Sequence, residues 1–144
     1  MSAPVETLVS VTRFRLRSLR FLPFFALHTN RTIAQIRKAD GFIAGAVRRD
    51  ADFAFWTMTV WRDETAMRAY GASGAHRKAA PHLVEWGDQA SVCHWTQEVA
   101  DLPEWPEAVR RLRETGRPLK LKHPAPDRAE KGFVEPKMTH GMRL

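Results

Sequence analysis

Histidine and the aromatic side chains near it are the residues of this sequence that are best suited to chemistry. His76 follows Tyr70 by six residues and directly precedes Arg77, in a segment that also contains small alanines. A neutral imidazole can bind iron or transfer a proton near pH 7. We therefore take His76 as the candidate catalytic residue. The alternative interpretation is a histidine that is hydrogen-bonded at the boundary between a helix and a sheet.

Three other histidines compete with His76 for a functional role. His82 follows a proline and is a second candidate, whereas we expect His28 and His94 to be packed against the core. His76 and His82 do not have the i, i+4 spacing that places two metal ligands on one helical face, so we expect no zinc site. The sequence leaves open which of these four histidines is functional.

Candidate ligand-binding side chains come from the same part of the chain. Trp56, Trp61 and Trp86 could line a pocket for an aromatic molecule, but large aromatic residues are also usual in the core between helices and a sheet. Arg17 stands at the end of a strand that carries three arginines, and its guanidinium suits planar anionic groups. The candidate substrate-binding residues are Trp61, Tyr70, Arg77, His82, Trp86 and Arg17.

Alternating residues predict the first strand of a sheet over residues 7–17. Leu8, Phe14 and Leu16 belong to an apolar row, and the other face carries Arg13 and Arg15 as well as Arg17. Such period-two alternation is typical of a strand with two different faces. We expect the arginine face to be solvated; contact with an anionic ligand or with carboxylates of a partner is the alternative.

The following segments predict a β-α-β-β-α-β order. After the first strand we expect a helix over 23–38, strands over 42–49 and 53–61, a helix capped by Asp63 and restarted near Ser73, and a strand over 91–99. This order is the ferredoxin-like arrangement, an α+β fold with a four-stranded antiparallel sheet and both helices on one face. The second face needs a cover, and a second subunit is the simplest one, so we expect a homodimer.

The strand over 53–61 decides which tryptophan faces the site. Trp61 shares a face with Thr57 and Thr59, whereas Trp56 and Met58 lie on the other face. If the face of Trp61 meets the helices, Trp61 lies near the floor of a helix–sheet cavity with His76 at its wall. If that face meets a partner subunit, Trp56 and Met58 line the cavity instead.

Composition narrows the class of protein. At 144 residues the chain predicts one domain, which we place at residues 1–115, followed by a basic extended or disordered arm over 116–144. A single cysteine, Cys93, fits a reducing compartment, and we expect a cytoplasmic location. No apolar run approaches the roughly 20 residues that span a membrane, so we expect no membrane partner.

The net charge does not by itself predict a nucleic-acid partner. Of the net +7, the arm contributes +4, from seven Lys/Arg against three Asp/Glu. No basic helix with interleaved aromatic residues appears, and a solvated excess of charge is the commoner interpretation. We expect no nucleic acid among the partners.

Thr59-Val60-Trp61, the acid-capped helix and the Ser73-Gly74-Ala75-His76-Arg77 segment together resemble the dimeric α+β barrel superfamily. Within it, the sequence is similar to antibiotic biosynthesis monooxygenase-like and spheroidene monooxygenase-like proteins, over about residues 7–99. The resemblance implies a ligand cavity between helices and sheet. In haem-degrading relatives a second-helix histidine binds the iron, a place that His76 or His82 could take. The only asparagine, Asn30, belongs to the first helix, which counts against haem degradation.

The residues and the resemblance together favour a small monooxygenase-like oxidoreductase. We expect it to act on a hydrophobic aromatic or polyene molecule, with haem or no cofactor. The alternative is a non-catalytic dimer that binds haem or another small molecule.

Overall fold

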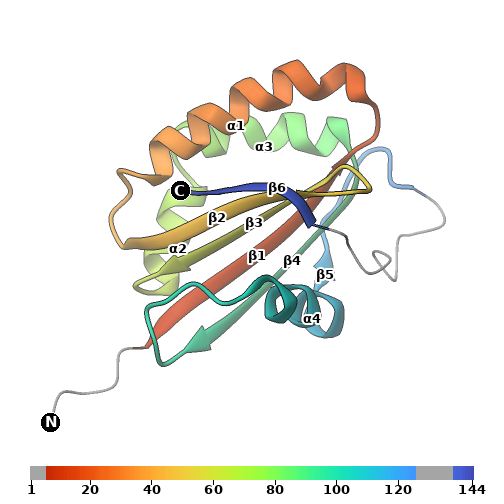
Figure 1. Cartoon of the computed structure of the whole chain (residues 1–144). Coiled ribbons are helices and arrows are strands. Elements are labelled where there is room, and N and C mark those ends of the chain that lie inside the picture. Colours follow the sequence, from red (N-terminus) through yellow and green to blue (C-terminus); the bar gives the residue numbers. More distant parts are fainter. Residues whose placement is uncertain (1–5, 126–137) are drawn as a thin grey trace, which may run out of the picture.

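The computed structural model describes residues 6–125 and 138–144 (Figure 1). The strands are β1 (Thr7–Leu16), β2 (Phe42–Asp50), β3 (Ala54–Trp61), β4 (Gly87–Gln97), β5 (Arg117–Pro118) and β6 (Met138–Arg143). The helices are the 3₁₀ turn η1 (Leu19–Phe21), α1 (Leu22–Ile36), α2 (Glu64–Gly71), α3 (Gly74–Trp86) and α4 (Trp105–Thr115). The predicted β-α-β-β-α-β order is present in β1 to β4.

The sheet has six strands in the order β5-β4-β1-β3-β2-β6, and every neighbouring pair is antiparallel. The prediction of four strands was therefore wrong in number, although the antiparallel sheet was predicted. Both additional strands come from the predicted arm. β5 pairs with β4, and β6 pairs with β2 through Ala46 and Arg143.

The end of the chain contributes to the core as well as to the sheet. Leu144 donates its backbone N–H to the Gly45 carbonyl at 2.9 Å, and it packs against the group of apolar residues that contains Trp61. An extended or disordered arm was predicted here, but strand pairing was not, because a strand partner far away in the sequence leaves no local pattern. Residues 126–137 of the arm lie outside the described residues. The domain boundary at 116 stays a prediction.

Local sequence explains where the helices begin. Pro23 stands in the first turn of α1, where its missing N–H is not needed. Asp63 caps α2 by accepting a hydrogen bond from the Ala66 N–H at 2.8 Å, as predicted. Ser73 precedes α3 but does not cap it with its side chain; its hydroxyl donates to the Ala69 carbonyl at 2.8 Å. α3 continues through Pro81 to Trp86.

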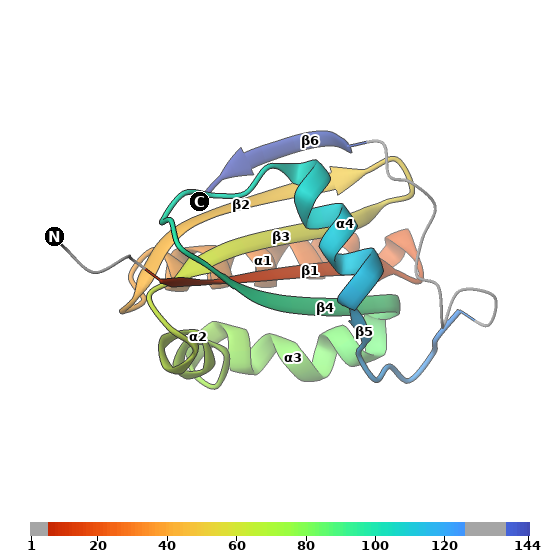
Figure 2. The same ribbon diagram turned by 90° about the horizontal axis from the view of Figure 1, so that it is seen from below.

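The helices lie on both faces of the sheet. α1 and α3 lie above it in Figure 1 and α4 lies below it, and in Figure 2 α4 crosses in front of the strands. On the α4 side, Val109 and Leu112 pack against strand residues that include Val11 and Trp56, and Trp56 is fully buried. One chain therefore supplies a cover for the face that we expected a second subunit to cover. The homodimer stays a prediction.

None of the helices in the described ranges 6–125 and 138–144 is long and apolar enough to cross a membrane.

Candidate functional site

Three aromatic rings form a chain on the helix side of the sheet. Trp61, at the end of β3, lies 5.2 Å from Tyr70 of α2 between ring centroids, and Tyr70 lies 4.9 Å from His76 of α3. Trp61 is 1% exposed, whereas Tyr70 and His76 are half-buried. The face of Trp61, Thr57 and Thr59 thus meets the helices, and Trp56 and Met58 pack under α4. The structure brings Trp61, Tyr70 and His76 together, and we call them the aromatic triad.

The hydrogen bonds of His76 determine the tautomer of its neutral ring. Nδ1 lies 3.0 Å from the Gly71 carbonyl oxygen, which can only accept, so Nδ1 carries the proton. The other ring nitrogen, Nε2, is then left with a lone pair. A neutral His76 can therefore accept a proton or bind a metal through Nε2.

The backbone around His76 is held by Gln35 of α1. Its Oε1 accepts from the His76 N–H at 2.8 Å, and its Nε2 donates to the Ser73 carbonyl at 2.8 Å and to the Tyr70 carbonyl at 3.2 Å. One amide side chain thus connects the ends of α2 and α3. Sequence reasoning missed Gln35, because an isolated glutamine in a helix does not indicate its partners.

The polar groups of Trp61 and Tyr70 both have partners. The indole Nε1 of Trp61 donates to the Thr59 hydroxyl at 2.9 Å, and the phenol of Tyr70 donates to the Thr32 carbonyl at 3.3 Å. Burial raises the pKa of Tyr70 to about 12, with an opposing contribution from the bond to Thr32. Tyr70 is therefore a neutral phenol at physiological pH and is not suited to act as a base.

A group of hydroxyls lies in the middle of the helix-facing side of the sheet. Ser10 pairs with Thr59 and Thr12 pairs with Thr57 across β1 and β3, so the four side chains form a compact patch. Ser10, Thr12 and Thr57 are only half-buried, and their side-chain oxygens have no hydrogen-bond partner among the described residues. We call these three the hydroxyl patch. They offer hydrogen bonds that the protein itself does not use.

A second aromatic group lies at the opposite end of α3. The rings of His82 and Trp86 stack at 5.1 Å, and His28 of α1 lies 5.0 Å from His82 and 5.6 Å from Trp86. Burial lowers the pKa of His28, and the nearby His82 and Arg31 lower it further. Arg17 joins the group by donating from Nε to the Glu85 carbonyl at 2.8 Å. We call His28, His82 and Trp86 the Trp86 group.

The predicted site residues are thus divided between two places. Trp61, Tyr70 and His76 are at one end of α3, whereas His82, Trp86 and Arg17 are at the other. Arg77 is exposed and belongs to neither group. His94 is exposed on β4, so the expectation that it is packed was wrong; the end of β4 has less cover than its alternation suggested.

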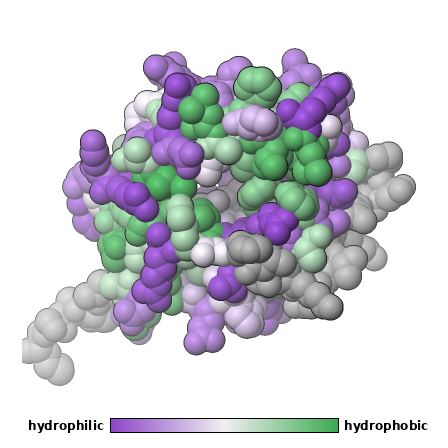
Figure 3. Space-filling model, turned by 45° about the horizontal axis from the view of Figure 1, so that its top comes forward, coloured by the Kyte–Doolittle hydropathy of each residue, from purple (hydrophilic) through white to green (hydrophobic). Residues whose placement is uncertain are grey.

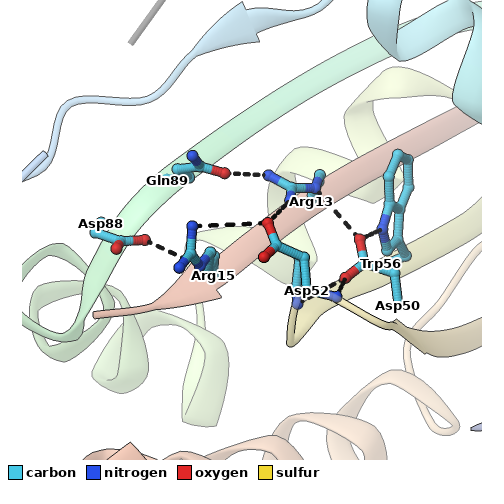
Figure 4. A network of polar contacts seen from close by, with 8 residues as sticks. Arg13, Arg15, Asp50, Asp52, Trp56, Asp88 and Gln89 are labelled. Atoms are coloured by element: carbon cyan, nitrogen blue, oxygen red, sulfur yellow. Dashed lines mark hydrogen bonds and ion pairs between the residues drawn. The ribbon is translucent and has the colours of Figure 1, made fainter. Parts of the chain in front are cut away.

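The arginine face of β1 is a buried polar network and not a solvated surface (Figure 4). Arg13 is 2% exposed and donates to the Gln89 Oε1 at 2.6 Å, while its Nε lies 3.6 Å from Asp50, an ion-pair distance longer than a hydrogen bond. Burial lowers the pKa of Arg13, and Asp50 and Asp52 oppose that shift. The prediction of a solvated face was wrong for Arg13, because the β2–β3 turn supplies carboxylates.

Asp50 is the centre of this network. It is 1% exposed and accepts from the Trp56 indole at 2.8 Å and from the Ala54 N–H at 3.0 Å. Arg15 lies 3.6 Å from Asp52. Asp50, Arg15 and Trp56 each have a partner in the network, whereas the buried Nε2 of Gln89 has no hydrogen-bond partner among the described residues.

The potential for binding a metal is limited within residues 6–125 and 138–144. They contain no cluster of three or more His, Cys, Asp or Glu side chains that could hold a metal ion. Cys93 is 4% exposed, and burial raises the pKa of its thiol to about 11, as suits a structural cysteine. Asn30 is exposed on α1 and does not belong to the sheet. If haem were bound, His76 could hold its iron through Nε2, because the bond from Nδ1 to Gly71 leaves the Nε2 lone pair available.

Comparison with solved structures shows the same fold in proteins of low sequence identity. PA3566 from Pseudomonas aeruginosa is 10% identical with a TM-score of 0.58, over 68% of this chain and 100% of that one. A conserved protein from Methanosarcina mazei Go1 is 16% identical with a TM-score of 0.57, over 64% and 93%. A Nitrosomonas europaea protein, provisionally described as an antibiotic biosynthesis monooxygenase, is 10% identical with a TM-score of 0.53, over 69% and 95%.

These likenesses confirm, at the level of the fold, the resemblance to antibiotic biosynthesis monooxygenase-like proteins. No curated protein matches the chain in sequence. One family model does match, over residues 25–120, which include most of α1, all of α2 to α4 and the aromatic triad. The chain therefore belongs to the family described as a domain of unknown function, DUF3291.

Proposed function

We propose that the protein is a monooxygenase-like oxidoreductase whose substrate lies between the sheet and helices α1 and α3. The observation that carries this proposal is the hydroxyl patch, because unused hydrogen-bonding groups lie between two aromatic groups on one side of the sheet. The part of α3 between these groups carries small residues, among them the buried Ala79. The description of the Nitrosomonas europaea protein as an antibiotic biosynthesis monooxygenase supports the same class of reaction.

The arrangement favours a hydrophobic aromatic or polyene substrate that carries oxygen substituents. Its apolar body would lie against the rings of Trp61 and Trp86, and its hydroxyl or carbonyl groups would bond to Ser10, Thr12 and Thr57. Pockets for such molecules are mostly apolar with a few polar groups that orient the ligand. The ends of α3 would thereby set the length of the substrate.

In this proposal, His76 acts as the base. Its Nε2 accepts a proton from the substrate, while the bond from Nδ1 to Gly71 stabilises the imidazolium that forms. The electron-rich substrate then reduces dioxygen directly: a CH₂ group becomes C=O, one oxygen atom enters the product and the other leaves as water. Tyr70, neutral because of its high pKa, orients the His76 ring by packing.

Oxygen consumption tests this function. Purified protein should consume dioxygen with polycyclic phenols, and His76→Ala should lose that activity while its melting temperature changes little. His123→Ala is the matched control, because His123 is an exposed histidine outside both aromatic groups, and it should retain the activity. Loss of folding in His76→Ala, or equal activity in both variants, would favour a histidine with a packing role.

Haem binding without catalysis is the second candidate, and the bond from Nδ1 of His76 to Gly71 favours it. Histidines that bind a metal commonly donate their other N–H to a carbonyl or carboxylate. Haem would supply redox chemistry at its iron, and His76 would hold it. Purified protein with a visible absorption band that disappears in His76→Ala would support this candidate over a cofactor-free site.

The assembly and location form part of the same proposal. A homodimer would fit a small enzyme of this fold, and a stable monomer in light scattering at micromolar concentration would contradict it. The lone, buried Cys93 suits the reducing cytoplasm.

A further inference from the structure

The outward side of the helical layer exposes large apolar side chains. Leu19 of η1 and Phe24 and Leu27 of α1 are 57%, 58% and 48% exposed. Figure 3 views the molecule from this side and shows hydrophobic side chains next to hydrophilic ones. We call the exposed side of η1, α1 and α3 the outer helical surface. It is separate from the hydroxyl patch, which lies on the helix-facing side of the sheet.

Cations occupy the same surface at helical spacing. Arg20, Phe24, Leu27 and Arg31 follow one another by four, three and four residues, which places them in one stripe along the helix. All four side chains are exposed. The stripe thus has an arginine at each end and two apolar side chains between them.

Carboxylates are missing from the sequence of this layer. Residues 19–39 contain four Lys/Arg and no Asp/Glu, and residues 65–84 contain three Lys/Arg and no Asp/Glu. Glu85 follows at the end of α3, but Arg17, Lys122 and His123 lie 3.5, 3.3 and 3.3 Å from its carboxylate. The outer helical surface is therefore uniformly cationic.

The cations of this surface lack ion-pair partners among the described residues, unlike many elsewhere. This applies to Arg20, Arg31, Arg37, Lys38, Arg77 and Lys78. By contrast, Arg62 pairs with Asp40, Arg68 with Glu64, and Arg110 with Glu114. Six cations without an ion-pair partner among the described residues thus lie on or next to the outer helical surface.

We propose that the outer helical surface docks on an anionic lipid membrane. A headgroup layer offers phosphates to Arg20 and Arg31, and the acyl boundary beneath it takes Phe24 and Leu27, as in helices that lie in the membrane plane. This contact differs from a membrane-spanning segment, which none of the helices within residues 6–125 and 138–144 could form. A second copy fits less well, because a two-fold contact would place like charges against each other.

Vesicle sedimentation tests the proposal with the full chain. The protein should sediment with phosphatidylcholine vesicles that contain phosphatidylglycerol and not with pure phosphatidylcholine. Arg31→Gln should weaken binding about fivefold, since a cation at such a surface contributes about 1 kcal/mol. Phe24→Ser/Leu27→Ser should weaken it about fifty-fold through lost apolar burial. Val99→Ser/Met142→Ser is the matched control, since both residues are exposed and lie outside this surface.

The outcomes separate the possible occupants. Selective loss of binding in the two surface variants, with unchanged melting curves, supports the membrane contact. No binding by the unchanged protein, binding that does not depend on anionic lipid, or equal loss in the control would overturn it. A change of oligomeric state in Phe24→Ser/Leu27→Ser would also overturn it, by showing that a second copy covers these residues. The oxygen-consumption assay uses soluble phenols and no vesicles. A negative result in the vesicle experiment therefore does not contradict the proposed enzyme function.

Discussion

Replacing Asp50 by alanine should destabilise the protein more than any other single change in the polar network. The carboxylate is 1% exposed and accepts hydrogen bonds from Trp56, Ala54 and Asp52 at 2.8, 3.0 and 2.9 Å. Removing one partner of a buried ion pair costs about 3–5 kcal/mol. Each orphaned buried donor costs about 1–3 kcal/mol, and these contributions overlap, so we expect a loss of about 5 kcal/mol. This is a large part of the roughly 5–15 kcal/mol that stabilises an ordinary domain.

Urea unfolding followed by tryptophan fluorescence measures this loss. Asp50→Ala should unfold at a far lower urea concentration, whereas Asp40→Ala, which removes an exposed pair with Arg62, should unfold almost as the unchanged protein does. Arg13→Met/Asp50→Leu should recover part of the loss, because no charge is then left buried without its partner. Equal midpoints for Asp50→Ala and Asp40→Ala would refute the reasoning that this network is dry and structural.

Three further predictions concern titration and the end of the chain. Tyr70 is the only tyrosine, so the phenolate absorption of the folded protein should appear with a pKa of about 12 instead of about 10; an ordinary titration would contradict its burial. The pKa of His28 is lowered on folding, so stability should be constant above about pH 6.5 and fall as the pH decreases below it; His28→Gln should flatten this decrease in melting temperature, and an unchanged decrease would contradict the assignment to His28. Deleting residues 138–144 removes β6 and the packing of Leu144, and should lower the melting temperature by about 5 °C or more; an unchanged melt would show that β6 contributes little.

Period-two alternation was sufficient to predict the strands of the central sheet. Leu8, Phe14 and Leu16 do face the helices, and the choice of Trp61 over Trp56 for that side follows from the same rule once the helices are placed. The cap of α2 by Asp63 was also predictable locally, whereas Ser73 does not cap α3 with its side chain. These features depend on neighbours within a few residues, which the sequence displays directly.

Contacts between distant segments were not predictable in the same way. Arg13 appeared to be a solvated side chain because its carboxylates come from the β2–β3 turn, and only the fold brings Asp50 beside it. Gln35 gave no indication that it binds the α2–α3 junction. The separation of His82 from His76 was partly visible in their spacing, but the pairing of His82 with His28 required the packing of α1 on α3.

The hydroxyl patch shows an intermediate case. Ser10 and Thr12 interrupt the apolar row of β1, which the sequence displays, but their meeting with Thr57 depends on the register of β1 and β3. A polar residue on the helix-facing side of a strand is therefore a candidate site residue, in addition to the histidines and tryptophans.

The two-residue strand β5 has a consequence for aggregation. A free sheet edge can accept a strand from another molecule, and short, proline-bearing edge strands oppose this. Pro118 has no N–H to donate, and beyond it Leu119 and Ala125 turn their N–H groups inward to Ala90 and Asp88 at 2.8 and 2.9 Å. These features oppose the addition of a strand from another molecule at the β5 edge of the sheet. The β6 edge, on the opposite side of the sheet, is therefore the edge at which we expect such pairing.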